Sequence, residues 1–130
     1  MSEKLSADTN SINWFEIPAT DIPRAKKFYE QIFGIKMEEM EMPGMKYCMF
    51  PFNPANGKVA GALAQSQIHI PGTTGAIIYL NANPNLQDVL DRVETAGGKI
   101  TMSKTSIGGN GFMGFFLDSE GNNMGLHSNS

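Results

Sequence analysis

The order of predicted elements repeats once along the chain. A short apolar strand, a capped helix with one apolar stripe and three strand-like segments follow one another over residues 11–66 and again over residues 75–128. The two halves align with residues 15–21 against residues 79–85, where order and spacing match although most identities differ. A helix covers only one face of its own strands, so each half needs a partner for the other face. The repeat therefore predicts an α+β fold of two βαβββ modules, with a curved eight-stranded sheet and the helices outside.

The two helical segments have clear boundary signals. Asp21 is a good N-cap for a helix over residues 22–33, with Pro23 in its first turn, and Gly34 can end that helix. In the second half, apolar residues recur at helical spacing before Gly97-Gly98; they are Leu86, Val89, Leu90 and Val93. Each helix is therefore expected to bury one stripe.

The last stretch, residues 117–128, predicts a β-hairpin. Residues 118–121 combine short acceptor side chains with a glycine, as a tight turn requires. In the strand that follows, Met124 and Leu126 are expected to be buried. The alternate residues then point to the opposite face, and they are Asn123, Gly125 and His127. The groups on that second face determine which chemistry is possible there.

Composition limits the class of partner. The net charge of the 130 residues is −3 and Lys and Arg form no cluster, which argues against nucleic acid. No apolar run reaches the roughly 18 residues that span a bilayer. Residues 1–10 lack the apolar centre of a signal peptide and are expected to be a flexible tail before a domain over residues 11–128. Cys48, the only cysteine, is expected to be a small buried strand residue. Together these features favour a cytoplasmic protein without membrane contact.

The segments around both helices and the last hairpin resemble a known family. They are Pro18 to Asp21, Phe28-Tyr29, Phe33-Gly34, Gly97-Gly98 and Asp118 to Asn122. In this order and spacing they resemble the vicinal oxygen chelate superfamily, which includes glyoxalase I, ring-cleaving dioxygenases, and bleomycin- and fosfomycin-resistance proteins. The resemblance covers residues 11–128, and the ending Gly125 to Ser128 is similar to that of small glyoxalase-like members. It implies paired βαβββ modules, frequent homodimers and a funnel-shaped site inside the curved sheet.

The resemblance implies a divalent metal only where the ligands are present. Glyoxalase-type members use His or Gln on the first strand, His on the first strand of the second module, and Glu on the last strand of each module. None of the corresponding positions here has a donor side chain: they are Trp14, Ala76 or Ile78, Gly125 and the neighbourhood of Gly61. A metal site needs three or four converging donors, whereas only Glu16 and His127 lie near the vacated positions. No metal site and no bound cofactor are therefore expected.

Four residues are expected to line a ligand cavity. Trp14 either fills the vacated metal space or offers a stacking surface for a planar ligand. Glu16 is the candidate catalytic residue, because an inward carboxylate is costly unless it is paired. It is expected to pair with Lys104 or His127, or to act on a ligand as anchor or general base. Lys104 and His127 are expected at the rim of the cavity.

The favoured interpretation is a homodimeric glyoxalase-like protein that binds a small organic molecule without metal, as the resemblance to bleomycin-resistance members implies. One alternative is a lyase or isomerase of the glyoxalase type, similar to lactoylglutathione lyase, that uses Glu16 or a rearranged metal site. Another is an interaction module whose cavity is filled by its own side chains. The sequence leaves open which molecule binds, and whether the modules pair within one chain or between two.

Overall fold

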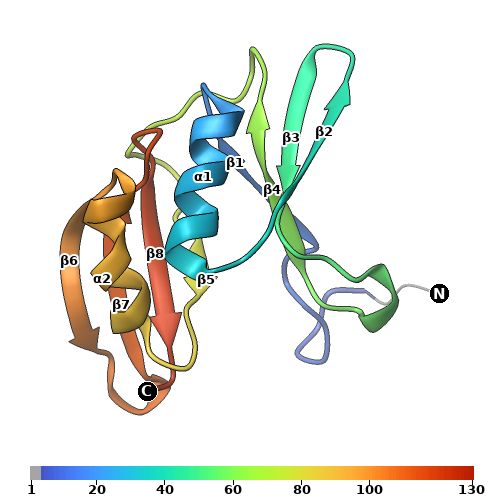
Figure 1. Cartoon of the computed structure of the whole chain (residues 1–130). Coiled ribbons are helices and arrows are strands. Elements are labelled where there is room, and N and C mark those ends of the chain that lie inside the picture. The colour runs from blue at the N-terminus through green and yellow to red at the C-terminus, as the bar shows by residue number, and fades with distance from the viewer. Residues whose placement is uncertain (1–3) are drawn as a thin grey trace.

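The chain folds into two helices and eight strands, which the computed structural model describes over residues 4–130 (Figure 1). The first module contains β1 (Trp14–Pro18), α1 (Ile22–Phe33), β2 (Glu38–Met42), β3 (Met45–Met49) and β4 (Ala60–Gln65). The second contains β5 (Tyr79–Asn81), α2 (Leu86–Ala96), β6 (Lys99–Ser106), β7 (Phe112–Leu117) and β8 (Asn123–Ser128). The predicted α+β class with two βαβββ modules is confirmed. Of the expected N-terminal tail, residues 1–3 lie outside the described residues, and residues 4–10 form turns and bends before β1.

The eight strands form two four-stranded sheets. Sheet 1 has the order β1-β4-β3-β2 and sheet 2 the order β5-β8-β7-β6, with no ladder between them in the described part of the chain. In each sheet the first strand runs parallel to the last strand of its module, and the remaining pairs are antiparallel. The parallel pairing sets Glu16 opposite Ala62 in sheet 1 and Tyr79 opposite Gly125 in sheet 2.

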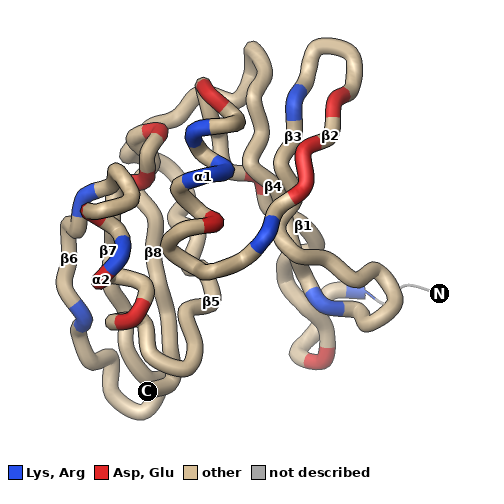
Figure 2. The backbone as a smooth tube through the Cα atoms, viewed as in Figure 1, with Lys and Arg blue, Asp and Glu red and all other residues tan. Residues whose placement is uncertain are grey.

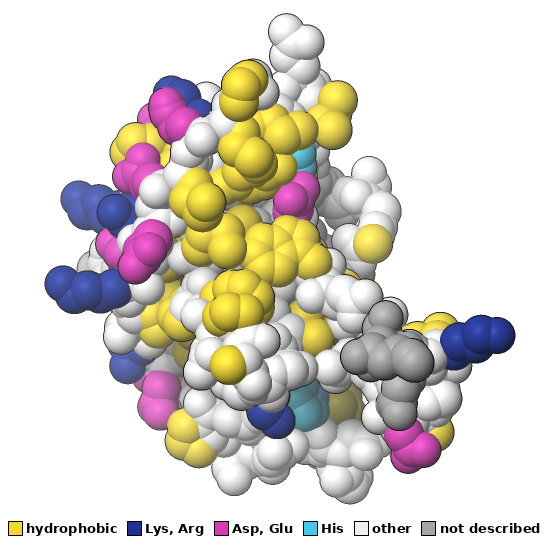
Figure 3. Space-filling view, turned by 90° about the vertical axis from the view of Figure 1, so that its right-hand side faces the viewer, with side chains coloured by type: hydrophobic (Ala, Val, Ile, Leu, Met, Phe, Trp, Pro, Cys, Tyr) yellow, Lys and Arg dark blue, Asp and Glu magenta, His cyan; other side chains and the backbone are white. Residues whose placement is uncertain are grey.

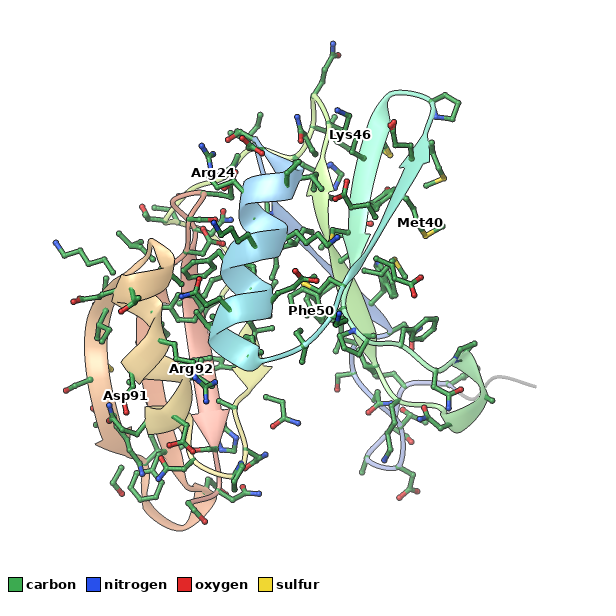
Figure 4. The ribbon with its side chains drawn as sticks, in the orientation of Figure 1. Arg24, Met40, Lys46, Phe50, Asp91 and Arg92 are labelled. Atoms are coloured by element: carbon green, nitrogen blue, oxygen red, sulfur yellow. The ribbon has the colours of Figure 1, made fainter. Side chains whose placement is uncertain are left out.

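The two helices share one hydrophobic core. Asp21 accepts the backbone N–H of Arg24 at 3.0 Å as the N-cap of α1, and Gly34 ends α1 in the left-handed conformation at φ 64°. Helix α1 lies between sheet 1 and the second module (Figure 1), where the Phe28 ring packs 5.9 Å from the Phe116 ring of β7. Figure 4 shows Arg92 of α2 at the end of α1, where it donates to the Ile32 carbonyl at 2.8 Å. The buried residues of both modules form one hydrophobic cluster.

The turn between β7 and β8 is hydrogen-bonded to the start of α1. Glu120 Oε1 accepts the backbone N–H groups of Thr20 at 2.8 Å and Asp21 at 3.0 Å, and Arg24 Nε donates to Oε2 at 2.7 Å. Burial alone would raise the pKa of Glu120, but the hydrogen bonds from Arg24, Thr20 and Ser119 lower it to about 2. A residue predicted only to form a turn therefore also fixes how the two modules meet.

Each sheet has one face covered by a helix and one open face. Cys48 is buried on the covered face of sheet 1, as expected, and burial raises the pKa of its thiol to about 11. Figure 2 shows Lys and Arg interspersed with acidic residues over both modules, in keeping with the sequence's lack of a basic cluster. Neither described helix is long and apolar enough to cross a membrane.

Candidate functional site

The open face of sheet 1 is built from alternate residues of its four strands. Trp14 pairs with Ala60 and Glu16 with Ala62, which puts both β1 side chains on the face opposite to buried Ile17. The pairing of the other strands adds Ala64, Met45, Tyr47, Met49, Met40, Met42 and the exposed Glu38 to this face. Hydrophobic side chains gather in a band down the middle of the molecule in Figure 3, and Figure 4 shows Met40 on the side away from α1. The open face is thus rich in aromatic and thioether groups.

Glu16 lies in a hydrogen-bonded cluster with the linker that follows β4. Its Oε1 is 2.7 Å from Nε2 of His69, and its Oε2 accepts the Nε1–H of Trp14 at 3.3 Å. Ser66 Oγ is 2.6 Å from the other ring nitrogen, Nδ1 of His69. The His69 side chain is 10% exposed and that of Glu16 is 30% exposed. The prediction that Glu16 pairs with Lys104 or His127 is wrong, because the linker folds back over β1 and brings His69 to the carboxylate.

Tyr47 of β3 adds a second aromatic group to this cluster. Its ring meets the His69 ring edge to face, with 6.5 Å between centroids, and its hydroxyl donates to the Met45 sulfur at 3.1 Å. Removal from water, followed by the charge of Glu16, raises the pKa of Tyr47. The Tyr47 phenol therefore stays protonated at neutral pH. Trp14 in turn packs edge-on against Phe52 at 5.8 Å, so an aromatic surface continues along the face.

Two cavities adjoin the Glu16–His69 pair. One, of about 520 Å³, lies between the β2–β3 hairpin and the linker, where Figure 4 shows Lys46, and Ser66 and His69 line it. The other, of about 390 Å³, lies between β1, the linker and the start of β8, and Glu16 lines it. Both volumes are typical of small-molecule sites. The hydrogen bond between Glu16 and His69 therefore lies between the two cavities, with His69 lining the first and Glu16 the second.

Lys104 and His127 belong to sheet 2 and serve different contacts. Lys104 Nζ donates at 2.9 Å to Asn85, the N-cap of α2, and lies 4.3 Å from the centroid of the Phe112 ring. Phe112 packs against the core, so Lys104 is on the helix-covered side of sheet 2. His127 Nε2 is 2.7 Å from the Asn110 carbonyl oxygen. The structure therefore brings Trp14 and Glu16 together but hydrogen-bonds Lys104 and His127 elsewhere.

Other groups occupy the positions that hold metal in the resembled family. A Cβ at Gly125 would lie 2.7 Å from the Tyr79 ring, so a carboxylate side chain does not fit there unless that ring moves. Gly61 faces Phe15 on the helix-covered side, and Ile78 packs against the core. Strand alternation places Tyr79 on the open face of sheet 2, rather than either of the expected positions, Ala76 or Ile78. Within residues 4–130, no three His, Cys, Asp or Glu side chains are grouped to hold a metal ion.

Ser66 and His69 are functional candidates that the sequence analysis missed. A loop position gives no periodic signal, and the contact between His69 and Glu16 spans 53 residues. The only local sign is the Ser-x-x-His spacing directly after a strand, which places the two side chains in one turn.

Comparisons with known proteins agree with this fold. Residues 11–126 match the family model described as "Glyoxalase/Bleomycin resistance protein/Dioxygenase superfamily". The chain is 31% identical over 116 residues to the protein named "Putative glyoxylase CFP32" of Mycobacterium tuberculosis, and the match covers 88% of this chain and 44% of CFP32. It is 30% identical over 128 residues to a glyoxylase-like domain-containing protein of Didymella fabae, covering 85% of this chain and 88% of that protein.

The solved structures give the same result for the fold. Glyoxalase I of Leishmania major superposes with a TM-score of 0.69 at 17% identity, over 93% of this chain and 88% of that one. The chain spans less than half the length of CFP32, at 44% of it. The family match extends over nearly the whole sequence and the paired modules agree with it, so this chain belongs to the Glyoxalase/Bleomycin resistance protein/Dioxygenase superfamily.

Proposed function

We propose that this protein binds a small planar organic molecule on the open face of sheet 1, without a metal ion. The observation that carries this proposal is the neighbouring placement of Trp14 and Glu16 on β1, with the carboxylate held by the Trp14 indole and by His69. Trp14 and Tyr47 supply aromatic surface for a planar ring. Glu16 has a carboxylate oriented to accept a hydrogen bond from a polar group of the ligand.

The residues beneath and around these groups support an adaptable apolar site. The central strand β4 contributes only the small side chains of Ala60, Ala62 and Ala64 to the open face, and neighbouring groups bury all three. Met45 and Met49 of β3 lie on the same face beside them. Methionine side chains are flexible and polarisable, and they adjust to ligands of irregular shape. The site therefore favours ligands with a flat apolar body and one polar edge.

The fate of the family's metal positions supports a metal-free site. Trp14 stands at the first of these positions, and the Tyr79 ring covers Gly125 at the last. Glu16 and His69 provide two donors that already bind each other at 2.7 Å. A stable site for Zn²⁺ or Ni²⁺ needs at least one more donor.

We also propose that the protein forms a homodimer through its exposed hydrophobic side chains and free strand edges. Met40, Met42 and Tyr79 are exposed by 51%, 50% and 49%, which is high for large hydrophobic side chains. In the described part of the chain, β1 and β5 each pair with one strand only, so both keep a free edge. Sedimentation equilibrium at micromolar concentration is expected to give the mass of two chains. The mass of a single chain at all concentrations would contradict the dimer.

A second candidate is a metal-independent lyase or isomerase of the glyoxalase type. The hydrogen bonds that orient Glu16 favour this candidate, because a carboxylate held next to a histidine can accept a proton from a carbon acid. The hemithioacetal of methylglyoxal and glutathione is the test substrate, in buffer with EDTA. Loss of turnover in Glu16→Gln, with an unchanged melting temperature, would support this candidate. Equal rates for the wild type and for Glu16→Gln would eliminate it.

Fluorescence tests the binding proposal directly, because Trp14 is the only tryptophan. The probe is N-phenyl-1-naphthylamine, a planar aromatic amine that accepts energy from tryptophan. Titration is expected to give saturable energy transfer. Tyr47→Ala is expected to raise the dissociation constant of the probe about 5-fold, since an aromatic contact contributes roughly 1 kcal/mol to binding.

The control is Ile107→Ala, in the loop after β6, which removes an exposed apolar side chain away from this face. Its affinity for the probe should equal that of the wild type. Equal weakening by both variants, or transfer that never saturates, would refute binding at the open face of sheet 1.

A further inference from the structure

The linker after β4 supplies a serine and a histidine that form a continuous chain of hydrogen bonds with Glu16. Ser66 Oγ is 2.6 Å from His69 Nδ1, and His69 Nε2 is 2.7 Å from Glu16 Oε1. Trp14 fixes the other carboxylate oxygen through its indole N–H at 3.3 Å. A hydroxyl group is activated as a nucleophile by a neighbouring base that a third group orients. Ser66, His69 and Glu16 have this arrangement, as hydroxyl, base and orienting carboxylate.

The partners of His69 determine where its proton lies. A carboxylate only accepts hydrogen bonds, so the Nε2 atom that faces Glu16 carries the hydrogen. The neutral imidazole then presents the lone pair of Nδ1 to Ser66, and the Ser66 hydroxyl donates its proton to it. The neutral form of His69 that fits these two partners is therefore the tautomer that can remove the proton from Ser66.

We propose that Ser66, His69 and Glu16 form a nucleophilic triad that hydrolyses small carboxylic esters in the 520 Å³ cavity. Ser66 and His69 line this cavity, and Met42 and Met45 give it an apolar wall that suits a short acyl chain. The backbone N–H of Gln67 donates to no acceptor among the described residues. An N–H of the residue after the nucleophile is a common donor to the oxyanion in acyl transfer.

The proposed reaction has two balanced halves. Ser66 Oγ attacks the ester carbonyl carbon while its proton passes to His69 Nδ1, and the C–O bond to the alcohol breaks as His69 returns that proton to the leaving oxygen. Water then attacks the acyl-serine with His69 as its base, which releases the carboxylic acid and restores the Ser66 hydroxyl. Glu16 contacts neither substrate nor nucleophile, so it is a positioning residue that stabilises the charged imidazole.

Local turn geometry does not account for this arrangement. Ser66 Oγ accepts the backbone N–H of Ile68 at 3.2 Å, which is a common turn contact. Ser106 makes the same contact with the N–H of Gly108 at 3.2 Å, and its turn has no histidine. The turn contact therefore forms without a histidine. Ser66 additionally contacts His69, which in turn contacts the Glu16 carboxylate from β1.

The test uses the full chain and two readouts. A fluorophosphonate probe is expected to label Ser66 covalently in the wild type, which peptide mass spectrometry locates. Hydrolysis of p-nitrophenyl butyrate is expected to fall about 100-fold or more in Ser66→Ala and in His69→Gln. Ser106→Ala, which removes a serine with the same turn contact, should hydrolyse the ester at the wild-type rate.

Glu16→Gln distinguishes a positioning role of Glu16 in catalysis from a purely structural role. It is expected to lower kcat and leave KM near the wild-type value, because Glu16 does not line the cavity that holds the ester. An unlabelled Ser66 in folded wild-type protein, or equal hydrolysis by the wild type and Ser66→Ala, would overturn the triad. Labelling of the wild type decides the question even where a variant fails to fold. The proposed aromatic ligand site is tested separately, by the Trp14 energy-transfer titration.

Discussion

At the scale of single residues, packing decides which side chain a position can hold. Gly125 stands where the family's last-strand carboxylate would be, and the Tyr79 ring lies across it on the neighbouring strand. The two residues are complementary, since the ring needs a partner without a Cβ. The Tyr79 ring in this cross-strand pair therefore takes the space that a side chain at position 125 would need.

Gly125→Ala is predicted to destabilise the protein by roughly 1–3 kcal/mol, because the new Cβ would overlap the Tyr79 ring. The double variant Gly125→Ala with Tyr79→Ala should cost less than the sum of the two single changes, since the clash is gone. Urea unfolding of the four proteins measures this coupling.

Gly109→Ala is the matched control, because no atom lies within 4 Å of a Cβ placed there. It should leave the free energy of unfolding within about 0.5 kcal/mol of the wild type. Strict additivity of the Gly125 and Tyr79 changes would show that the ring does not occupy this space.

At the scale of elements, hydrogen bonds to the ends of α2 and α1 set the positions of neighbouring strands. Lys104 illustrates this, since its contact with the N-cap Asn85 joins β6 to α2. Such a contact stabilises the fold and holds the Lys104 ammonium group on the helix-covered side of sheet 2.

Lys104→Ala is predicted to lower the free energy of unfolding by about 0.5–1 kcal/mol, through loss of the contacts with Asn85 and the Phe112 ring. The affinity for N-phenyl-1-naphthylamine should stay at the wild-type value. Chemical unfolding and the fluorescence titration measure the two quantities on the same samples. A large loss of affinity for the probe, with the free energy of unfolding unchanged, would show that Lys104 contributes to the ligand site.

The predicted elements agree with the structure where a local signal exists. Asp21 and Gly34 bound α1 as expected, because capping depends on neighbours in sequence. The strand before the second helix is short, since β5 contains only Tyr79–Asn81. The positions of Glu16 and Trp14 on one face followed from alternation. Their partner His69 could not be predicted, since the path of an irregular linker depends on the finished fold.

At the scale of the whole molecule, the contact between modules rests on a few buried polar groups. The Glu120 side chain is fully buried at this junction, where it accepts hydrogen bonds from the first turn of α1 and from Arg24. Tyr29 and Asp118 add a buried hydrogen bond of 2.7 Å beside it. The resulting arrangement leaves both open faces available to a ligand or to a second chain.

Glu120→Gln is predicted to destabilise the protein at pH 7 by roughly 1–3 kcal/mol, because the amide lacks the charge that pairs with Arg24. The folded-state pKa of about 2 is below the ordinary 4.5, so the carboxylate's contribution is complete above pH 4.5 and is lost as the pH falls toward 2. Thermal melts from pH 7 to pH 2 should show the gap between wild type and variant closing over that window.

Glu41→Gln on the exposed strand β2 is the control for this series. Its melting temperature should follow that of the wild type at every pH. A gap between the wild type and Glu120→Gln that stays constant down to pH 2 would contradict the role of the charged carboxylate.

Metal-free binding on the open face of sheet 1 is tested most directly by the Trp14 energy-transfer titration with N-phenyl-1-naphthylamine, run in parallel with EDTA and with added Zn²⁺ or Ni²⁺. We predict the same saturable transfer and the same dissociation constant in all samples, because aromatic and thioether groups of sheet 1 bind the probe. Transfer that is absent in EDTA and restored by either metal would contradict it.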